Sequence, residues 1–177
     1  MSLMPLDDQA PLNGEVEEIF AQMQASIGFV PNAFRMLSGN PLWLRQQWEF
    51  IGYYMNHPSL SFALQALIRL LVSTGAKCSY CVDMNASMLI QMAGWTPEQV
   101  AAARLDPENA PLPDRDKRLL RLILKALADS NSLSAADMDQ ARDMGWSDRD
   151  ILDALNHAAR QLSIDFLINA VQVDRDY

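Results

Sequence analysis

Apolar residues recur with the period of an α-helix through nearly the whole of this 177-residue chain. Two clear apolar stripes consist of Val16, Ile19, Phe20 and Met23, and of Leu64, Leu67, Ile68 and Leu71. No stretch shows the strict alternation of apolar and polar residues that is typical of a half-buried strand. The sequence therefore predicts an all-α fold, a compact domain of several packed helices.

The punctuation of the sequence agrees with this helical pattern. Asn40 stands directly before Pro41, which is the order expected for an N-cap followed by proline at the first helical position. The apolar pattern then continues until Pro58 interrupts it. We expect one helix over residues 40–57.

A proline-rich break at residues 106–113 separates two helical halves, roughly 1–105 and 113–177, within one predicted domain of residues 1–177. Each half contains a helix pair followed by a Gly-Trp step and a hydroxyl N-cap. These steps are Gly94, Trp95 and Thr96 with Gln99, and Gly145, Trp146 and Ser147 with Asp150. The pattern indicates an internal helix-hairpin duplication, or else the chance reuse of a good helix stop and start.

Composition and charge narrow the classes of partner. Half of the residues are hydrophobic, so the chain can bury a core without disulfide bonds or a structural metal. The formal net charge of −8 disfavours binding to the phosphates of nucleic acids. No signal-peptide pattern and no apolar run long enough to cross a bilayer is apparent. We expect a cytoplasmic protein without membrane or nucleic-acid partners, in a compartment that keeps thiols reduced.

The most informative motif is the pair Cys78 and Cys81, the two cysteines of the chain. Gly75 ends an apolar helix, and a new helix is expected over residues 79–92. Cysteines three apart at a helix start lie on the same side, close enough to form a disulfide. The helix dipole and the neighbouring Lys77 favour the thiolate form. This pattern predicts a redox-active pair in which one sulfur attacks a peroxide or a disulfide and the other resolves the product.

Two other interpretations of the cysteines stay open. A zinc site takes four ligands, and His57 and His157 would have to converge on the pair to complete it. The cysteines can also be buried residues without chemistry. We expect no metal and no cofactor.

The residues around the pair carry a family resemblance over most of the chain. The segment Gly28 to Phe34, the apolar run Leu67 to Ser73 and the sequence Cys78-Ser-Tyr-Cys81 resemble the alkylhydroperoxidase D and carboxymuconolactone decarboxylase superfamily, in particular its peroxidase-related branch. This resemblance implies an AhpD-like fold and a peroxiredoxin-type enzyme of antioxidant defence. It also implies that Cys81 attacks the peroxide with Cys78 as its partner, that a thiol reductant restores the pair, and that the protein forms homo-oligomers.

Two residues depart from the family motif. The family places a histidine four residues after the attacking cysteine, where this chain has Asn85, and a glutamate near the position of Ala66. Asn85 could donate a hydrogen bond to the sulfur of Cys81 but cannot carry a proton near neutral pH. Loss of a general base commonly slows a reaction by about a hundredfold to ten-thousandfold. The resemblance therefore implies a weakened peroxidase.

Two further residues are weighed as supporting groups. The phenol of Tyr80 can hydrogen-bond a peroxide or a sulfur, or Tyr80 is a packed aromatic residue. His157, with its ring held by Asp153, can replace the missing relay, or it is a partly exposed helical histidine paired with an acid. His57 stands at the end of a predicted helix as a favourable cation, and we assign it no chemistry.

The leading hypothesis is a thiol-dependent peroxidase or disulfide oxidoreductase. Its substrate would be a hydroperoxide, or a protein or small-molecule disulfide. One alternative is a lactone enzyme similar to carboxymuconolactone decarboxylase, which rests on the resemblance alone. The other is a non-catalytic helical module for assembly or binding.

Overall fold

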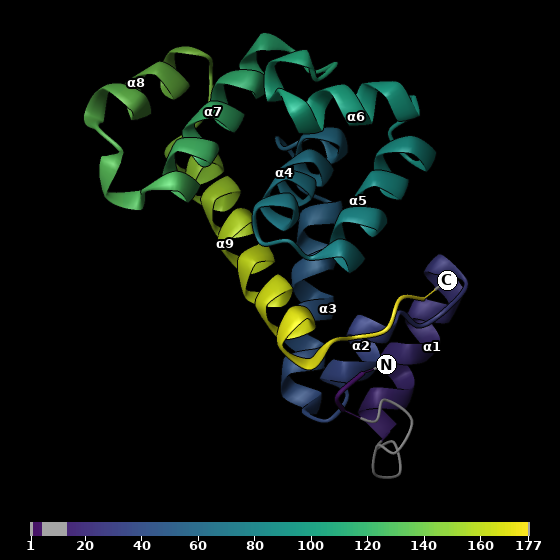
Figure 1. Ribbon diagram of the computed structural model, residues 1–177. Helices are drawn as coiled ribbons and strands as arrows, with labels where there is room; N and C mark the ends of the chain where they lie inside the picture. The colour runs from purple at the N-terminus through teal and green to yellow at the C-terminus, as the bar shows by residue number, and fades with distance from the viewer. Residues whose placement is uncertain (1, 5–13, 177) are drawn as a thin grey trace. The chain divides into compact units, whose positions relative to one another are not determined.

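The computed structural model describes residues 2–4 and 14–176, and every regular element within them is helical (Figure 1). This confirms the predicted all-α fold. The α-helices are α1 (Gly14–Ile27), α2 (Asn32–Leu37), α3 (Pro41–Met55), α4 (Phe62–Gly75), α5 (Ser79–Gln91), α6 (Pro97–Leu105), α7 (Asp114–Ala128), α8 (Ala135–Asp143) and α9 (Asp148–Val171). Two short 3₁₀ helices, Pro107–Asn109 and Ser130–Ser132, lie in the connections before α7 and α8.

The chain divides into two compact units. The first consists of residues 1–56 and 167–177, and the second of residues 57–166. In the first unit α1 and α2 both pack against α3, and the buried side chains of Met23, Phe34 and Leu44 contribute to its core. These boundaries differ from the proline-rich break at residues 106–113. The single domain of residues 1–177 stays a prediction.

The second unit contains α4 to α8 and most of α9. The helix α4 packs along α5 and also contacts α7, while α6 contacts α5 and α8 contacts α7. Fully buried leucine and isoleucine side chains fill the spaces between these helices, and burial of such side chains is the main force that holds a helical unit together. This second unit contains both cysteines.

The helix boundaries follow the expected signals. The Asn40 side chain accepts a hydrogen bond from the Trp43 N–H at 3.3 Å, and α3 ends at Met55, two residues before the predicted end. The helix α4 ends at Gly75 and α5 begins at Ser79, as predicted.

Both predicted hydroxyl caps are also present. Thr96 exchanges hydrogen bonds with Gln99, and Ser147 does so with Asp150. The glycines of the Gly-Trp steps, Gly94 and Gly145, have φ of 73° and 86°, a left-handed conformation that suits a residue without a Cβ atom. The helix-hairpin duplication is compatible with these features and stays a prediction.

Within the described ranges, no helix combines the length and apolarity that crossing a bilayer requires.

The second unit has an unusual core. Apart from the cap residue Asp150, six of its buried polar residues lie on three helices, and they are Gln65 and Ser73 on α4, Asn85 on α5, and His157, Gln161 and Asp165 on α9. Buried polar groups need partners, so this cluster marks the region of the fold where function is expected.

Candidate functional site

The two cysteines occupy the first turn of α5. Cys78 is the N-cap residue, and Cys81 is the third residue of the helix. Both are free thiols, with exposed fractions of 0% for Cys78 and 4% for Cys81. The Cys78 side chain makes no capping hydrogen bond, so its sulfur is left for other interactions. The predicted placement of the thiol pair at a helix start is therefore confirmed.

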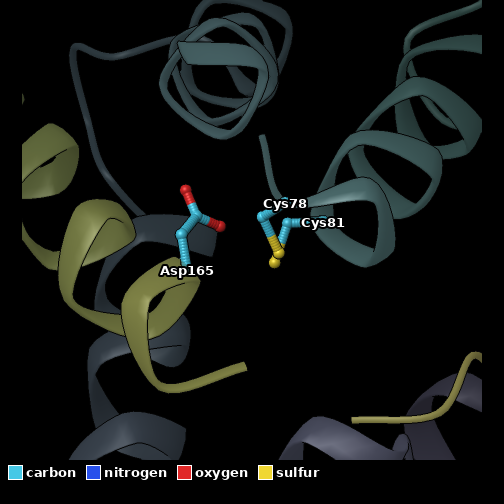
Figure 2. A group of neighbouring side chains, drawn as sticks. All are labelled: Cys78, Cys81 and Asp165. Atoms are coloured by element: carbon cyan, nitrogen blue, oxygen red, sulfur yellow. The ribbon is translucent and has the colours of Figure 1, made fainter. Parts of the chain in front are cut away.

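A buried carboxyl group faces the thiol pair. Asp165 on α9 has an exposed fraction of 0%, and one of its carboxyl oxygens and the two sulfurs all lie within 4.8 Å of one another (Figure 2). The Oδ1 atom of Asp165 accepts hydrogen bonds from the Ser73 hydroxyl at 3.0 Å and the Gln161 amide at 2.8 Å. Its Oδ2 atom is buried without a hydrogen-bond partner in the described part of the chain. Burial raises the pKa of Asp165, and its contacts with the thiols, Gln161 and Ser73 oppose this shift only in part.

The two thiols differ in acidity. The Cys81 thiol donates a hydrogen bond to the Cys78 sulfur, and this donation lowers the pKa of Cys78 below its ordinary value. The same hydrogen bond, together with burial and the negative charge of Asp165, raises the pKa of Cys81. The pair therefore holds its first negative charge at Cys78 and keeps the proton on Cys81.

A half-buried cation lies near the thiols. The Arg69 side chain on α4 donates from Nε to Asn85 Oδ1 at 2.7 Å, and its Nη1 lies 3.1 Å from His157 Nε2. Its Nη2 lies 3.5 Å from the Met88 sulfur. Burial lowers the pKa of Arg69 to about 10, and attraction to the Cys81 sulfur opposes the shift. Arg69 is thus protonated at neutral pH and is held by uncharged groups.

The structure places the two histidines differently from the prediction. His157 is buried beside Arg69, so the expectations that Asp153 holds its ring and that it is partly exposed are wrong. The Asp153 carboxylate instead lies 3.2 Å from His57 Nε2. Because Arg69 donates to Nε2 of His157, the proton of this neutral ring is on Nδ1. Burial and the charge of Arg69 lower the pKa of His157 to about 3.

Asn85 has a different role from the one expected. Its amide donates to the backbone carbonyl of Cys81 at 2.8 Å, so the expectation that it bonds to the sulfur is wrong. Its side-chain oxygen accepts from Arg69, which fixes the guanidinium group near the thiols. Ala66 is fully buried and brings no carboxylate to the site.

The remaining predicted residues lie on either side of the first cysteine. Tyr80 is 6% exposed, which fits a packed aromatic residue. Lys77 is exposed and adopts a left-handed backbone with φ of 56° as the chain enters α5. The supporting roles of Tyr80 and Lys77 stay predictions.

Sequence reasoning missed three residues of the site, namely Arg69, Asp165 and Gln161. A signal was present, because polar residues recur every four positions along α4 and along α9. These stripes are Gln65, Arg69 and Ser73 on α4, and His157, Gln161 and Asp165 on α9. Residues at this spacing share one helix face, and in α4 and α9 that face is turned toward the core.

The donor set also bears on metal binding. Two thiol sulfurs and one carboxylate oxygen within 4.8 Å form a group that a thiophilic ion such as zinc could use. The fourth ligand would have to come from elsewhere, since Asp153 and Arg69 engage the two histidines. His57 and His157 therefore do not complete a zinc site with Cys78 and Cys81.

The helices that carry this site have a known arrangement. A comparison of the sequence with protein-family models finds no match, and neither does a comparison with curated proteins. A solved structure of an uncharacterized peroxidase-related protein from Silicibacter sp. TM1040 matches with a TM-score of 0.86 and 25% identity, over 98% of this chain and 91% of that one.

Two further solved structures are similar. An alkylhydroperoxidase AhpD core, a peroxidase-related protein from Ralstonia eutropha JMP134, has a TM-score of 0.84 and 23% identity over 99% of this chain and 92% of its own. The debrominase Bmp8 matches with a TM-score of 0.72 and 16% identity over 92% of this chain and 87% of its own. With its all-helical fold and a thiol pair at the start of α5, the chain thus has the fold of the AhpD-like peroxidase-related proteins, which supports the resemblance to the alkylhydroperoxidase D and carboxymuconolactone decarboxylase superfamily.

Proposed function

We propose that this protein is a thiol-dependent peroxidase that cycles Cys78 and Cys81 between dithiol and disulfide. The observation that carries the proposal is the pair of free thiols on the first turn of α5, hydrogen-bonded to each other and next to a buried carboxyl group. A dithiol of this kind gives up two electrons when it closes to a disulfide, which is what reduction of a hydroperoxide requires.

The reaction proceeds in two steps. In the first, the Cys81 thiol gives its proton to a base as its sulfur attacks the terminal oxygen of a hydroperoxide, the O–O bond breaks, and Cys81 becomes a sulfenic acid while the released alkoxide takes up the proton and leaves as an alcohol. In the second, the Cys78 sulfur attacks the Cys81 sulfur, water leaves, and a disulfide forms. An external thiol reductant then returns both cysteines to the reduced state. The same dithiol can reduce a foreign disulfide by thiol exchange.

Arg69 supports the sulfur anions in this scheme. Its guanidinium group is the nearby cation that interacts with Cys81, and a positive charge favours thiolate over thiol. Asn85 and His157 hold it in place through uncharged atoms, so the charge of Arg69 is not neutralised by a carboxylate at these contacts. In this protein a fixed cation thus takes over part of the task of the absent family histidine.

The proposal also concerns where and how the protein works. A dithiol that must be reduced again after each turnover needs a reducing compartment, which we propose is the cytoplasm. We further propose a homo-oligomer, on the resemblance to the family.

The experiment that tests the function follows the thiols directly. Reduced protein is mixed with a small excess of hydroperoxide, and free thiols and mass are measured over time. We expect loss of two thiols and of two hydrogens in mass for the wild type. Cys78→Ser should instead stop at a sulfenic acid on Cys81 that a dimedone probe traps, and Cys81→Ser should form neither product.

The control and the contradicting outcomes complete this test. Ser79→Ala changes an exposed residue between the two cysteines and should react like the wild type. If both thiols of the native protein persist under peroxide while the urea-unfolded protein reacts, the peroxidase proposal is wrong. A non-catalytic module would behave in this way.

A further inference from the structure

We propose that Asp165 carries the proton in this reaction, in place of the glutamate and histidine of the family motif. The inference rests on the proposed peroxidase function and adds a catalytic residue that the sequence did not indicate. Asp165 lies on α9, 84 positions after Cys81, so only the packing of α9 near the start of α5 brings its carboxyl group to the sulfurs.

The geometry fits a proton carrier. Ser73 and Gln161 fix Oδ1 by two hydrogen bonds, which sets the direction of the carboxyl group. Oδ2 is buried and without a hydrogen-bond partner in the part of the chain that the structure describes. A buried oxygen without a partner is costly, and the sulfurs of Cys78 and Cys81, which lie within 4.8 Å of one carboxyl oxygen of Asp165, are the groups whose protons this carboxyl group can accept.

The surroundings tune this carboxyl group toward its task. The helices packed around it contribute the thiols from α5, the cation Arg69 from α4, and the neutral groups Gln161 and His157 from α9 itself. Burial raises the pKa of Asp165 above that of an exposed aspartate. A base whose pKa lies closer to the working pH returns its proton more readily to a leaving oxygen.

Each proton has a defined path. When the Cys81 sulfur attacks, its proton passes to the carboxylate of Asp165, and Asp165 then donates it to the alkoxide oxygen released by O–O cleavage. In the second step Asp165 takes the proton of the Cys78 thiol as the Cys78 sulfur attacks, and donates it to the hydroxide that leaves Cys81 as water. The carboxylate is regenerated at the end of each step, and the electrons come from the two sulfurs.

A proton carrier and a mere neighbouring charge make opposite predictions. The negative charge of Asp165 raises the pKa of both Cys78 and Cys81. Replacing Asp165 by asparagine should therefore produce more thiolate at a given pH. If the charge were all that mattered, the variant would react with peroxide at least as fast as the wild type. If Asp165 moves the proton, the variant reacts more slowly although it has more thiolate.

The experiment measures both quantities on Asp165→Asn, with a metal chelator present. Thiolate absorbance against pH should shift to lower pH, and the rate of peroxide-driven thiol loss at pH 7 should fall by about a hundredfold or more. Asp143→Asn removes an exposed aspartate at the end of α8 and is the matched control, expected to change neither quantity. A rate within a few fold of the wild type, with thiolate at lower pH, would overturn the inference.

A second variant keeps the test informative if Asp165→Asn does not fold. Ser73→Ala removes a hydrogen bond that lowers the pKa of Asp165. The pH at which the peroxide rate rises should therefore move upward, whereas an unchanged profile would contradict a role for Asp165.

Two further outcomes distinguish the proton-carrier role of Asp165 from the peroxidase proposal and from metal binding. If the wild type itself forms no disulfide, the peroxidase proposal fails, and the role of Asp165 fails with it. If zinc added without chelator accelerates the wild type and leaves Asp165→Asn unaffected, the carboxylate is a metal ligand and the proton-carrier role is wrong.

Discussion

The first turns of α5 and α8 use the same two positions for different purposes. In α8 the N-cap Ser134 and the third residue Asp137 form a capping box, with Asp137 accepting from the Ser134 backbone at 2.8 Å. In α5 these positions are Cys78 and Cys81, and the cap side chain makes no such bond. A capping side chain commonly contributes about 1 kcal/mol to stability, so α5 gives up stability at the positions where it carries thiols.

The carboxyl groups near the two helix starts, Asp137 in α8 and Asp165 beside α5, also serve different purposes. Asp137 is half-buried, and hydrogen bonds from Lys125 and Ser134 hold its pKa at about 2, where it is a fixed anion. Asp165 is buried near the thiols, and burial raises its pKa. A structural carboxylate is therefore kept charged, while the one beside the cysteines is placed where it can exchange a proton.

The largest expected difference concerns the third residue of each helix. Cys81→Ser should abolish peroxide-driven disulfide formation, because the remaining sulfur has no partner. Asp137→Ser, at the same position of α8, should leave the rate within about twofold, because it alters only a helix cap and an ion pair with Lys125. Counting free thiols after peroxide treatment of both variants checks this. Equal rates in the two variants would remove the functional distinction between the two helix starts.

The second prediction compares the helices that precede α5 and α8. Arg69→Met should lower the free energy of unfolding by about 3 kcal/mol, because Asn85 and His157 lose a charged donor inside the core. Arg118→Met on α7 removes a half-buried arginine whose hydrogen bond to Gln140 is exposed, and should cost no more than about 0.5 kcal/mol. Urea unfolding of the two variants gives the comparison. The Arg69 variant should also form thiolate only at higher pH.

The third prediction uses acid to separate the two regions. His157 is neutral when folded, with a pKa of about 3, whereas the pKa of a histidine in an unfolded chain is about 6.5. The unfolded state therefore binds the extra proton, so stability is complete above pH 6.5 and falls as the pH drops toward 3. Between pH 6.5 and 5 the loss should be about 2 kcal/mol.

The control for this prediction is His157→Gln, which has no ring to titrate. Its unfolding free energy should change by about 2 kcal/mol less over the same pH interval than that of the wild type. Urea unfolding at the two pH values measures this difference. Identical pH dependence in both proteins would mean that His157 is not the buried neutral ring described above.

The smallest expected effect concerns the caps themselves. Ser134→Ala should destabilise the protein by about 1 kcal/mol and leave the thiol chemistry unchanged. Cys78→Ser should supply the cap that α5 lacks and recover up to a similar amount, at the expense of the disulfide. Thermal unfolding of the reduced proteins compares the two. A large loss of stability in Cys78→Ser would show that sulfur packing outweighs the missing cap.

The sequence by itself determined the local features of this protein. Helix periodicity, the Asn40 and Thr96 caps and the position of Cys78 and Cys81 at a helix start are all encoded within a few residues, because capping and helical spacing are short-range effects. The departure of Asn85 from the family motif could also be read directly.

Only the tertiary structure decided which distant side chains meet the thiols. Asp165, Arg69 and His157 come from α9 and α4, and their contacts with α5 depend on how the helices pack. The same packing places the Asp153 carboxylate beside His57 and buries His157. Burial sets the directions of these pKa shifts, and burial is a property of the assembled core that a linear pattern of residues does not contain.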